Sequence, residues 1–185
     1  SFGQRIGEMI SFRANALYTL SGSANIPNAG YDESSSIGYN WLWFPRNGNI
    51  KAYKDYWKTG LDGKEQRNTE ELWTNNPWMV ANENTNSFLS HRFIADAIMT
   101  IHLRKGLKAR FRGSADVMND TRYFKRAYST KGVPFGSYRR DEIKFAELNI
   151  EGMLSYEFKE ENQPFSFSVT VVVNLMRQSG GSVRM

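Results

Sequence analysis

The chain has 185 residues and 21.3 kDa, with 24 Lys and Arg against 19 Asp and Glu, a net charge of +5, two His and no Cys. The absence of Cys excludes disulfide frameworks, thiolate metal ligands and Cys nucleophiles, and two His leave little room for a His-based metal centre. No apolar run is long enough for a membrane-spanning helix. Adjacent basic residues form nothing longer than a pair, and acids dilute these pairs, which argues against a nucleic-acid partner.

Alternation of apolar and polar residues predicts five strands, because successive side chains of a strand point to opposite faces. The five segments follow one another along the chain as residues 10–20, 89–103, 107–117, 146–158 and 165–175. In the third, Leu107, Ala109 and Phe111 alternate with Lys108 and Arg110. Each predicted strand therefore has one apolar and one polar face.

The length of these strands indicates the class of fold. Strands of soluble proteins usually run about 5–6 residues, whereas these alternate over about 11 to 15. A membrane-spanning β-strand needs about 9–11 residues, and alternation over such lengths is typical of an outer-membrane barrel. A soluble sandwich or a lipocalin-like barrel, whose strands also alternate, is the alternative.

The connections between the strands alternate between long and short. Arg104–Gly106 and Lys159–Pro164 are short, whereas residues 22–88 and 119–141 form long connections. Outer-membrane barrels place short turns in the periplasm and long loops outside the cell, so we predict that 22–88 and 119–141 are extracellular loops. Five strands cannot close a barrel. We therefore predict an all-β fold, in which residues 1–185 are part of the antiparallel β-barrel domain of a larger membrane protein.

The first long loop is rich in aromatic residues. All five Trp lie between positions 41 and 78, and the stretch Lys51–Lys58 has helical spacing of its aromatics. These side chains form the core of the loop, an interface with a partner protein, or a surface that contacts ligand by stacking. The candidates for ligand or partner contact are Trp41, Trp43, Tyr53, Trp57, Trp73 and Trp78.

Charged residues occupy the polar faces of the predicted strands. We expect them to face the barrel lumen and to form cross-strand ion pairs, with Arg112 diagonally opposite Asp96. Contact with a plug inside the barrel or with a passing solute is the alternative. The candidates are Arg92, Asp96, Arg110, Arg112, Asp116, Glu147 and Glu151. No recognisable catalytic motif is present, so we expect no enzyme, no cofactor and no metal.

The segment from Asn75 to Met118 resembles the barrel region of the SusC/RagA family of TonB-dependent outer-membrane transporters of Bacteroidetes. The matching features are Asn76-Pro77-Trp78, Glu83-Asn84, Arg92 near the start of a strand, and the hairpin whose second strand carries Asp116. The upstream stretches Ile26–Asp32 and Phe44–Tyr56 resemble the long loop that precedes this junction in the family.

This resemblance implies a location in the bacterial outer membrane, in a barrel of about 22 strands with a plugged lumen. It also implies TonB-dependent import of a glycan oligomer or a peptide together with a SusD-like surface lipoprotein. A plug domain and a TonB box are not present in this chain, so both are expected elsewhere in the protein. The alternatives are an outer-membrane binding or structural barrel without TonB coupling, and a soluble sugar-binding β-domain.

Overall fold

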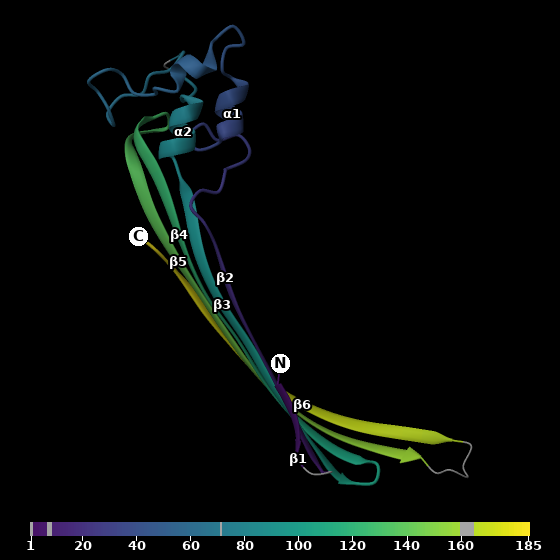
Figure 1. The fold of residues 1–185 in the computed structure, drawn as a ribbon. Coiled ribbons are helices and arrows are strands. Elements are labelled where there is room, and N and C mark those ends of the chain that lie inside the picture. Colours follow the sequence, from purple (N-terminus) through teal and green to yellow (C-terminus); the bar gives the residue numbers. More distant parts are fainter. Residues whose placement is uncertain (1, 7–8, 71, 160–164) are drawn as a thin grey trace. The chain divides into compact units, whose positions relative to one another are not determined.

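A computed structural model describes residues 2–6, 9–70, 72–159 and 165–185. Within them the chain forms one antiparallel sheet, and each strand pairs with the next in the order β1-β2-β3-β4-β5-β6 (Figure 1). The strands are β1 (Phe2–Ile6), β2 (Ile10–Ser23), β3 (Asn86–Arg104), β4 (Leu107–Thr130), β5 (Val133–Lys159) and β6 (Ser166–Arg184). The helices, between β2 and β3, are α1 (Ile37–Leu42), the short 3-10 helix η1 (Ile50–Tyr53) and α2 (Pro77–Glu83).

The predicted all-β class and the five predicted strands are confirmed, and the sheet gains the short strand β1, in which Phe2 pairs with Ala14 of β2. The strands β4 and β5 are longer than predicted, with 24 and 27 residues. Residues 119–141, expected as a long loop, are mostly the outer parts of these two strands and leave only Lys131-Gly132 as the turn. The sequence pattern missed this extension because both faces carry polar residues there, while the backbone ladder depends little on side-chain polarity.

The hairpin between β3 and β4 turns at Lys105-Gly106, within the predicted short connection. Gly106 has φ +78°, and a Cβ at this position would lie 2.2 Å from the backbone oxygen of Glu157. Only glycine fits, because it combines the left-handed conformation with the close approach of β5. In the other short connection, Lys159–Pro164, residues 160–164 lie outside the described residues.

The chain divides into two compact units, which are described separately. Unit 1 comprises residues 1–20, 90–119 and 143–181. In the middle of β5 in this unit three large aliphatic side chains are exposed, with exposed fractions of 50% for Leu148, 54% for Ile150 and 48% for Leu154. The intervening Glu147 and Glu151 are half-buried. A soluble sheet packed on a core shows the opposite distribution.

Unit 2 comprises residues 21–89, 120–142 and 182–185, and it contains all the helical segments. The helices α1 and α2 lie beside each other (Figure 1). The helix α1 begins at Ser36, whose hydroxyl accepts from the Tyr39 N–H at 3.2 Å. The helix α2 begins at Asn76, whose Oδ1 accepts from the Trp78 N–H at 2.9 Å, with Pro77 at the first helical position. Both starts use side chains that are common helix caps.

The spacing of the aromatics in Lys51–Lys58 suggested a helical turn or two, and a single 3-10 turn forms at the start of this stretch. The helical segment is only Ile50–Tyr53, so Tyr56 and Trp57 lie outside it. Trp57 instead forms an antiparallel bridge with Gln66. A short strand-like pairing satisfies the backbone here, and it replaces the turn of helix that the side-chain spacing suggested.

Among the described residues only two hydrophobic side chains are fully buried, Met79 and Val80 of α2. Apart from Pro77, the other buried side chains of the described residues are polar, and all belong to unit 2. They are Ser35, Ser36, Asn40, Gln66, Thr74, Asn75, Asn76, Asn84, Asp120 and Thr130. Unit 2 is therefore built on hydrogen-bonded amides, and the apolar face of unit 1 needs an apolar environment outside the described chain.

Candidate functional site

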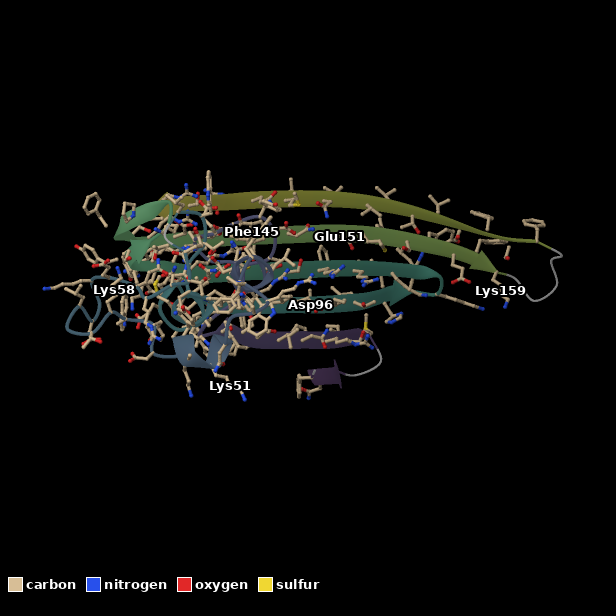
Figure 2. The ribbon with its side chains drawn as sticks, turned by 90° about the horizontal axis from the view of Figure 1, so that it is seen from above. Lys51, Lys58, Asp96, Phe145, Glu151 and Lys159 are labelled. Carbon is tan, nitrogen blue, oxygen red and sulfur yellow. The ribbon has the colours of Figure 1, made fainter. Side chains whose placement is uncertain are left out.

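The first candidate site is the polar face of the sheet in unit 1. Contacts between strands show that the predicted faces are continuous. Asn15 of β2 donates to both carboxylate oxygens of Asp96 on β3, at 3.2 and 3.1 Å. Arg92 of β3 binds Asp116 of β4 through two bonds of 3.0 and 2.6 Å. Figure 2 shows the rows of side chains along the strands, with Asp96 and Glu151 labelled.

The expected placement of Arg112 opposite Asp96 does not produce an ion pair. Asn15 occupies both oxygens of Asp96, and Arg112 has no hydrogen bond or ion pair with any described residue. Glu147 and Glu151 likewise form no ion pair within the described chain, although they lie half-buried on the same face. The structure therefore brings two of the seven candidates, Arg92 and Asp116, into direct contact.

Two clusters of aromatic residues stand at the ends of the apolar face in unit 1. At one end Tyr18 and His91 form a hydrogen bond of 2.6 Å between Oη and Nδ1. At the other end Phe158 stacks on Phe165 and Phe167 with ring centroids 6.2 and 5.3 Å apart. Phe165 and Phe167 belong to the predicted alternation, yet their contact with Phe158 was not predicted because it depends on the strand register.

The second candidate site is the exposed aromatic surface of unit 2. Of the six aromatic candidates, Trp41, Trp43 and Trp73 are exposed, with fractions of 55%, 54% and 75%. Trp43 lies 6.4 Å from the ring of Tyr39, and Tyr39 packs edge-on against Tyr31 at 4.9 Å. Tyr31 and Trp43 thus flank the half-buried Tyr39, and their exposed rings are available for stacking on a ligand or for contact with a protein.

The remaining three candidates are half-buried parts of the loop's own packing. The indole N–H of Trp78 donates to the Ile50 carbonyl at 3.0 Å. The ring of Tyr53 packs against Phe44 at 5.6 Å and lies under the guanidinium of Arg67 at 5.0 Å. Trp57 packs against Tyr56 at 5.4 Å. These three side chains pack within the loop, whereas the other three aromatic candidates are exposed to solvent.

A network of buried amides holds the Tyr53 and Trp78 segments in place, and no sequence pattern predicted it. Asn75 donates its backbone N–H to the side chain of Asn40 at 2.6 Å, and Gln66 Nε2 donates to Asn75 Oδ1 at 2.7 Å. Asn76 donates from Nδ2 to the carbonyls of Tyr53 and Arg67 at 2.9 and 2.7 Å. The sequence feature that could have indicated the network is the density of Asn between positions 75 and 86, at 75, 76, 82, 84 and 86.

Asn84 connects this network to β4. Its Oδ1 accepts from the Ala127 N–H at 2.9 Å, and its Nδ2 donates to the Thr130 hydroxyl at 3.1 Å. Both Asn84 and Thr130 are fully buried, and a buried amide that lost these partners would cost about 1–3 kcal/mol. The features that suggested the family resemblance, Asn76-Pro77-Trp78 and Asn84, are thus structural elements of unit 2.

Glu70 organises the backbone beside Trp73. Burial opposes ionisation of its carboxylate, but bonds from the backbone N–H groups of Leu72, Trp73 and Thr74 and from the Thr74 hydroxyl outweigh it. The pKa of Glu70 is therefore below its ordinary value of 4.5. The ionised carboxylate fixes the turn that exposes Trp73.

Two further features are absent from the described part of the chain. No helix there is long and apolar enough to cross a membrane. No group of three or more His, Asp and Glu side chains there is arranged to hold a metal ion.

The meander of six strands, with alternating faces and two-residue turns after β3 and β4, defines the chain as a segment of an antiparallel β-barrel. No protein-family model and no curated protein matches the chain. Two structures of the RagAB peptide importer, in its 'closed-closed' and 'open-open' states, align with 98% of this chain at TM-scores of 0.67 and 0.68 and 18% identity. A structure of the RagAB peptide transporter aligns at a TM-score of 0.58 and 15% identity. The chain spans 20–24% of the length of these proteins, and at this identity the likeness shows the fold.

Proposed function

We propose that this chain is part of the barrel wall of an outer-membrane transporter that imports a nutrient, a peptide or a glycan oligomer. The observation that carries the proposal is the reversed burial in the middle of β5, where Leu148, Ile150 and Leu154 are exposed while Glu147 and Glu151 are half-buried. Lipid covers the apolar face and the aqueous lumen contacts the polar face in such a barrel. The solved structures with the same fold are peptide importers, which favours a peptide as the solute.

The dimensions of the apolar face support a membrane location. From His91 to Leu103, β3 rises about 40 Å, which at a strand tilt of about 40° spans about 30 Å along the membrane normal. A hydrocarbon core is about 30 Å thick. The Tyr18–His91 pair lies at the His91 end of this span. The cluster of Phe158, Phe165 and Phe167 lies at the opposite end of the apolar face. Aromatic residues are enriched at both interfaces of membrane barrels.

In this proposal the import is coupled to TonB and assisted by a SusD-like surface lipoprotein. The exposed Trp41, Trp43 and Trp73 contact the lipoprotein or the solute, and the polar face of unit 1 lines the path. The edges of β1 and β6 each have one neighbour in the sheet, so further strands of the barrel would pair there.

The experiment is peptide uptake by cells that produce the full-length protein, combined with fractionation of their membranes. We expect the protein to remain in the outer membrane through carbonate washing and to leave it with detergent. Uptake should stop when a protonophore collapses the proton gradient that drives TonB. Release by carbonate would indicate a soluble β-domain, and membrane retention without uptake would indicate a binding or structural barrel.

A further inference from the structure

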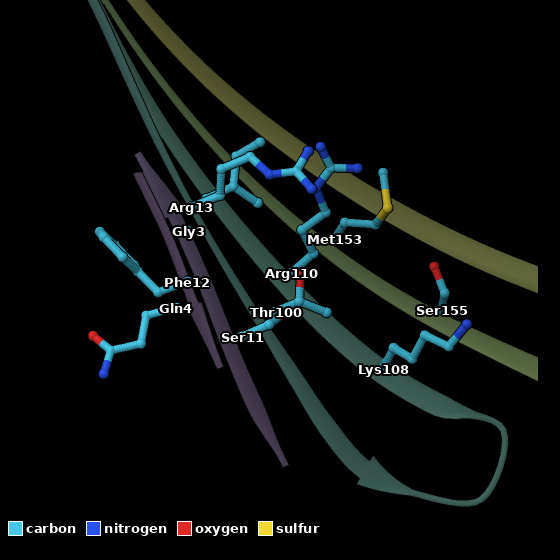
Figure 3. Close-up of a pocket in the computed structure, with 11 residues that line it drawn as sticks. Gly3, Gln4, Ser11, Phe12, Arg13, Thr100, Lys108, Arg110, Met153 and Ser155 are labelled. Atoms are coloured by element: carbon cyan, nitrogen blue, oxygen red, sulfur yellow. The ribbon is translucent and has the colours of Figure 1, made fainter. Parts of the chain in front are cut away.

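A cavity of about 560 Å³ opens in unit 1 between strands of the sheet (Figure 3). Three cationic side chains line it, Arg13 of β2 and Lys108 and Arg110 of β4, together with the hydroxyls of Ser11, Thr100 and Ser155. No Asp or Glu is among the described residues that line the cavity. The cavity is therefore rich in hydrogen-bond donors and carries a concentrated positive charge.

The two arginines of this cavity have no partner in the described chain. Neither Arg13 nor Arg110 forms a hydrogen bond or an ion pair with a described residue, and the Nε of Arg110 is buried without an acceptor. Figure 3 shows the guanidinium ends of Arg13 and Arg110 pointing toward one another. Lys108 reaches Glu157 only at 4.0 Å. Arg92, in contrast, is bound by both oxygens of Asp116 at 3.0 and 2.6 Å.

A bound anion would offset the repulsion between the two arginines and accept hydrogen bonds from their unpaired N–H groups. Two like charges that face the same cavity repel each other, and a buried donor without an acceptor loses the hydrogen bond that it makes in water. A carboxylate matches the planar fork of a guanidinium and accepts two parallel bonds from it. The three hydroxyls supply further donors to the same ligand.

We propose that Arg13 and Arg110, assisted by Lys108, bind the carboxylate of a peptide as it moves along the polar face. The proposal rests on the proposed function, because it assumes that a solute passes this face. Every unmodified peptide ends in a carboxylate, whereas a neutral glycan has none, so the cavity selects for the peptide. The cavity is a transient binding site, and no covalent bond is made or broken there.

The test compares two labelled probes in cells that produce the full-length protein, penta-alanine with a free C-terminal carboxylate and the same peptide with a C-terminal amide. We expect the wild type to take up the free acid about tenfold better at low concentration, which corresponds to one charge-assisted hydrogen-bonding contact. The Arg13→Gln, Arg110→Gln double variant should take up both peptides at the rate of the amide. The Arg13→Lys, Arg110→Lys variant keeps the charge and should keep most of the preference.

Arg46→Gln is the control for the loss of an arginine charge, since Arg46 is exposed in unit 2, does not line the cavity and belongs to neither candidate site. It should leave the preference unchanged. A preference that survives in the Gln double variant, or that Arg46→Gln abolishes equally, overturns the site. An equal fall in the uptake of both peptides by the Gln double variant shows a structural defect and also overturns it.

The failure of the proposed function gives a different result. If the wild type takes up neither the two peptides nor oligogalacturonate, the transport proposal fails and the binding site fails with it. If the wild type takes up both peptides equally, transport stands and only the binding site is lost. Uptake of oligogalacturonate that depends on Arg13 and Arg110, without uptake of penta-alanine, would overturn the choice of a peptide.

Discussion

At the scale of single residues, the exposed apolar face of unit 1 assigns opposite roles to neighbouring positions of β6. Val171 has an exposed fraction of 60% and belongs to the apolar alternation, whereas Ser168 belongs to the polar one. Hydrogen bonds between polar positions, such as Ser155 with Thr170 at 3.1 Å, place the even positions of β6 on the polar face. The face of a side chain therefore determines which substitutions a membrane barrel tolerates.

Val171→Arg should impair insertion of the full-length barrel, because an arginine on the lipid face near the midplane costs about 2–4 kcal/mol. The measurement is the fraction of folded protein in the outer membrane, read from heat-modifiable mobility in gels. Ser168→Arg is the control and should insert nearly as well as the wild type. Equal effects at both sites would contradict the assignment of faces.

The difference between the packed Trp78 and the exposed Trp73 can be measured by substitution. Trp78→Ala removes a half-buried ring and its bond to Ile50 and should lower the stability of the protein by about 3 kcal/mol. Trp73→Ala removes a ring that is 75% exposed and should leave the thermal midpoint within about 1–2 °C of the wild type. If Trp73 contacts solute or lipoprotein, Trp73→Ala reduces uptake or co-purification of the lipoprotein instead. A large loss of stability in Trp73→Ala would show that it belongs to the packing.

Glu70 predicts a pH dependence of unit 2. Because its pKa in the folded state lies below 4.5, the ionised carboxylate contributes stability that is fully present above the unfolded pKa and is lost as the pH falls through the folded pKa. Glu70→Gln should therefore lower the thermal midpoint at pH 7, and the difference from the wild type should shrink below about pH 4.5. Asp62→Asn, at an exposed position without a hydrogen bond to a described residue, should show no such difference. A Glu70→Gln effect that is constant from pH 7 to pH 3 would contradict the role of the charge.

At the scale of elements, the turns fix how the strands meet. Gly106 and Gly60 share the same left-handed φ of +78°, but their surroundings differ. A Cβ at Gly106 would lie 2.2 Å from the Glu157 backbone oxygen, whereas nothing lies within 4 Å of a Cβ at Gly60. An alanine at Gly60 would therefore add backbone strain alone, whereas an alanine at Gly106 would add the same strain and a steric collision.

Gly60→Ala should cost about 1 kcal/mol, the strain of a left-handed alanine. Gly106→Ala should cost at least about 2 kcal/mol more, because β5 must move away from the turn to remove the collision. The temperature at which the folded barrel converts to the unfolded band in gels gives both values. Similar losses for the two variants would mean that β5 yields easily at Glu157.

The sequence predicted the strands and their faces because alternation is a property of the strand backbone itself. The outer parts of β4 and β5, from Asp120 to Arg140, were not predicted, since charged and aromatic residues there occupy both faces. The amide network around Asn75 and Asn84 was also missed, because Asn usually indicates turns and loops. Packing against distant partners determines both features, and a single sequence does not display such partners.

At the scale of the whole molecule, the predicted sidedness of the connections is untested and can be measured. A short epitope inserted between Gly60 and Gly63 should be accessible to antibody on intact cells, because residues 22–88 are predicted to lie outside. The same epitope at Lys105-Gly106 should become accessible only after the outer membrane is permeabilised. Labelling of both sites on intact cells would contradict the assignment of this turn to the periplasm.

The short β4–β5 turn and the long β2–β3 connection predict an order in which the strands pair during folding. The β4–β5 hairpin closes through two residues, Lys131 and Gly132, so its pairing is local and can spread rapidly from the turn. Pairing of β2 with β3 must first bring together the ends of residues 24–85, and loop-closure entropy delays this step. The amide network of unit 2 shortens that effective loop once it forms. A variant that disrupts it, such as Asn75→Ala, should therefore slow assembly of β2 onto the sheet more than it slows formation of the β4–β5 hairpin.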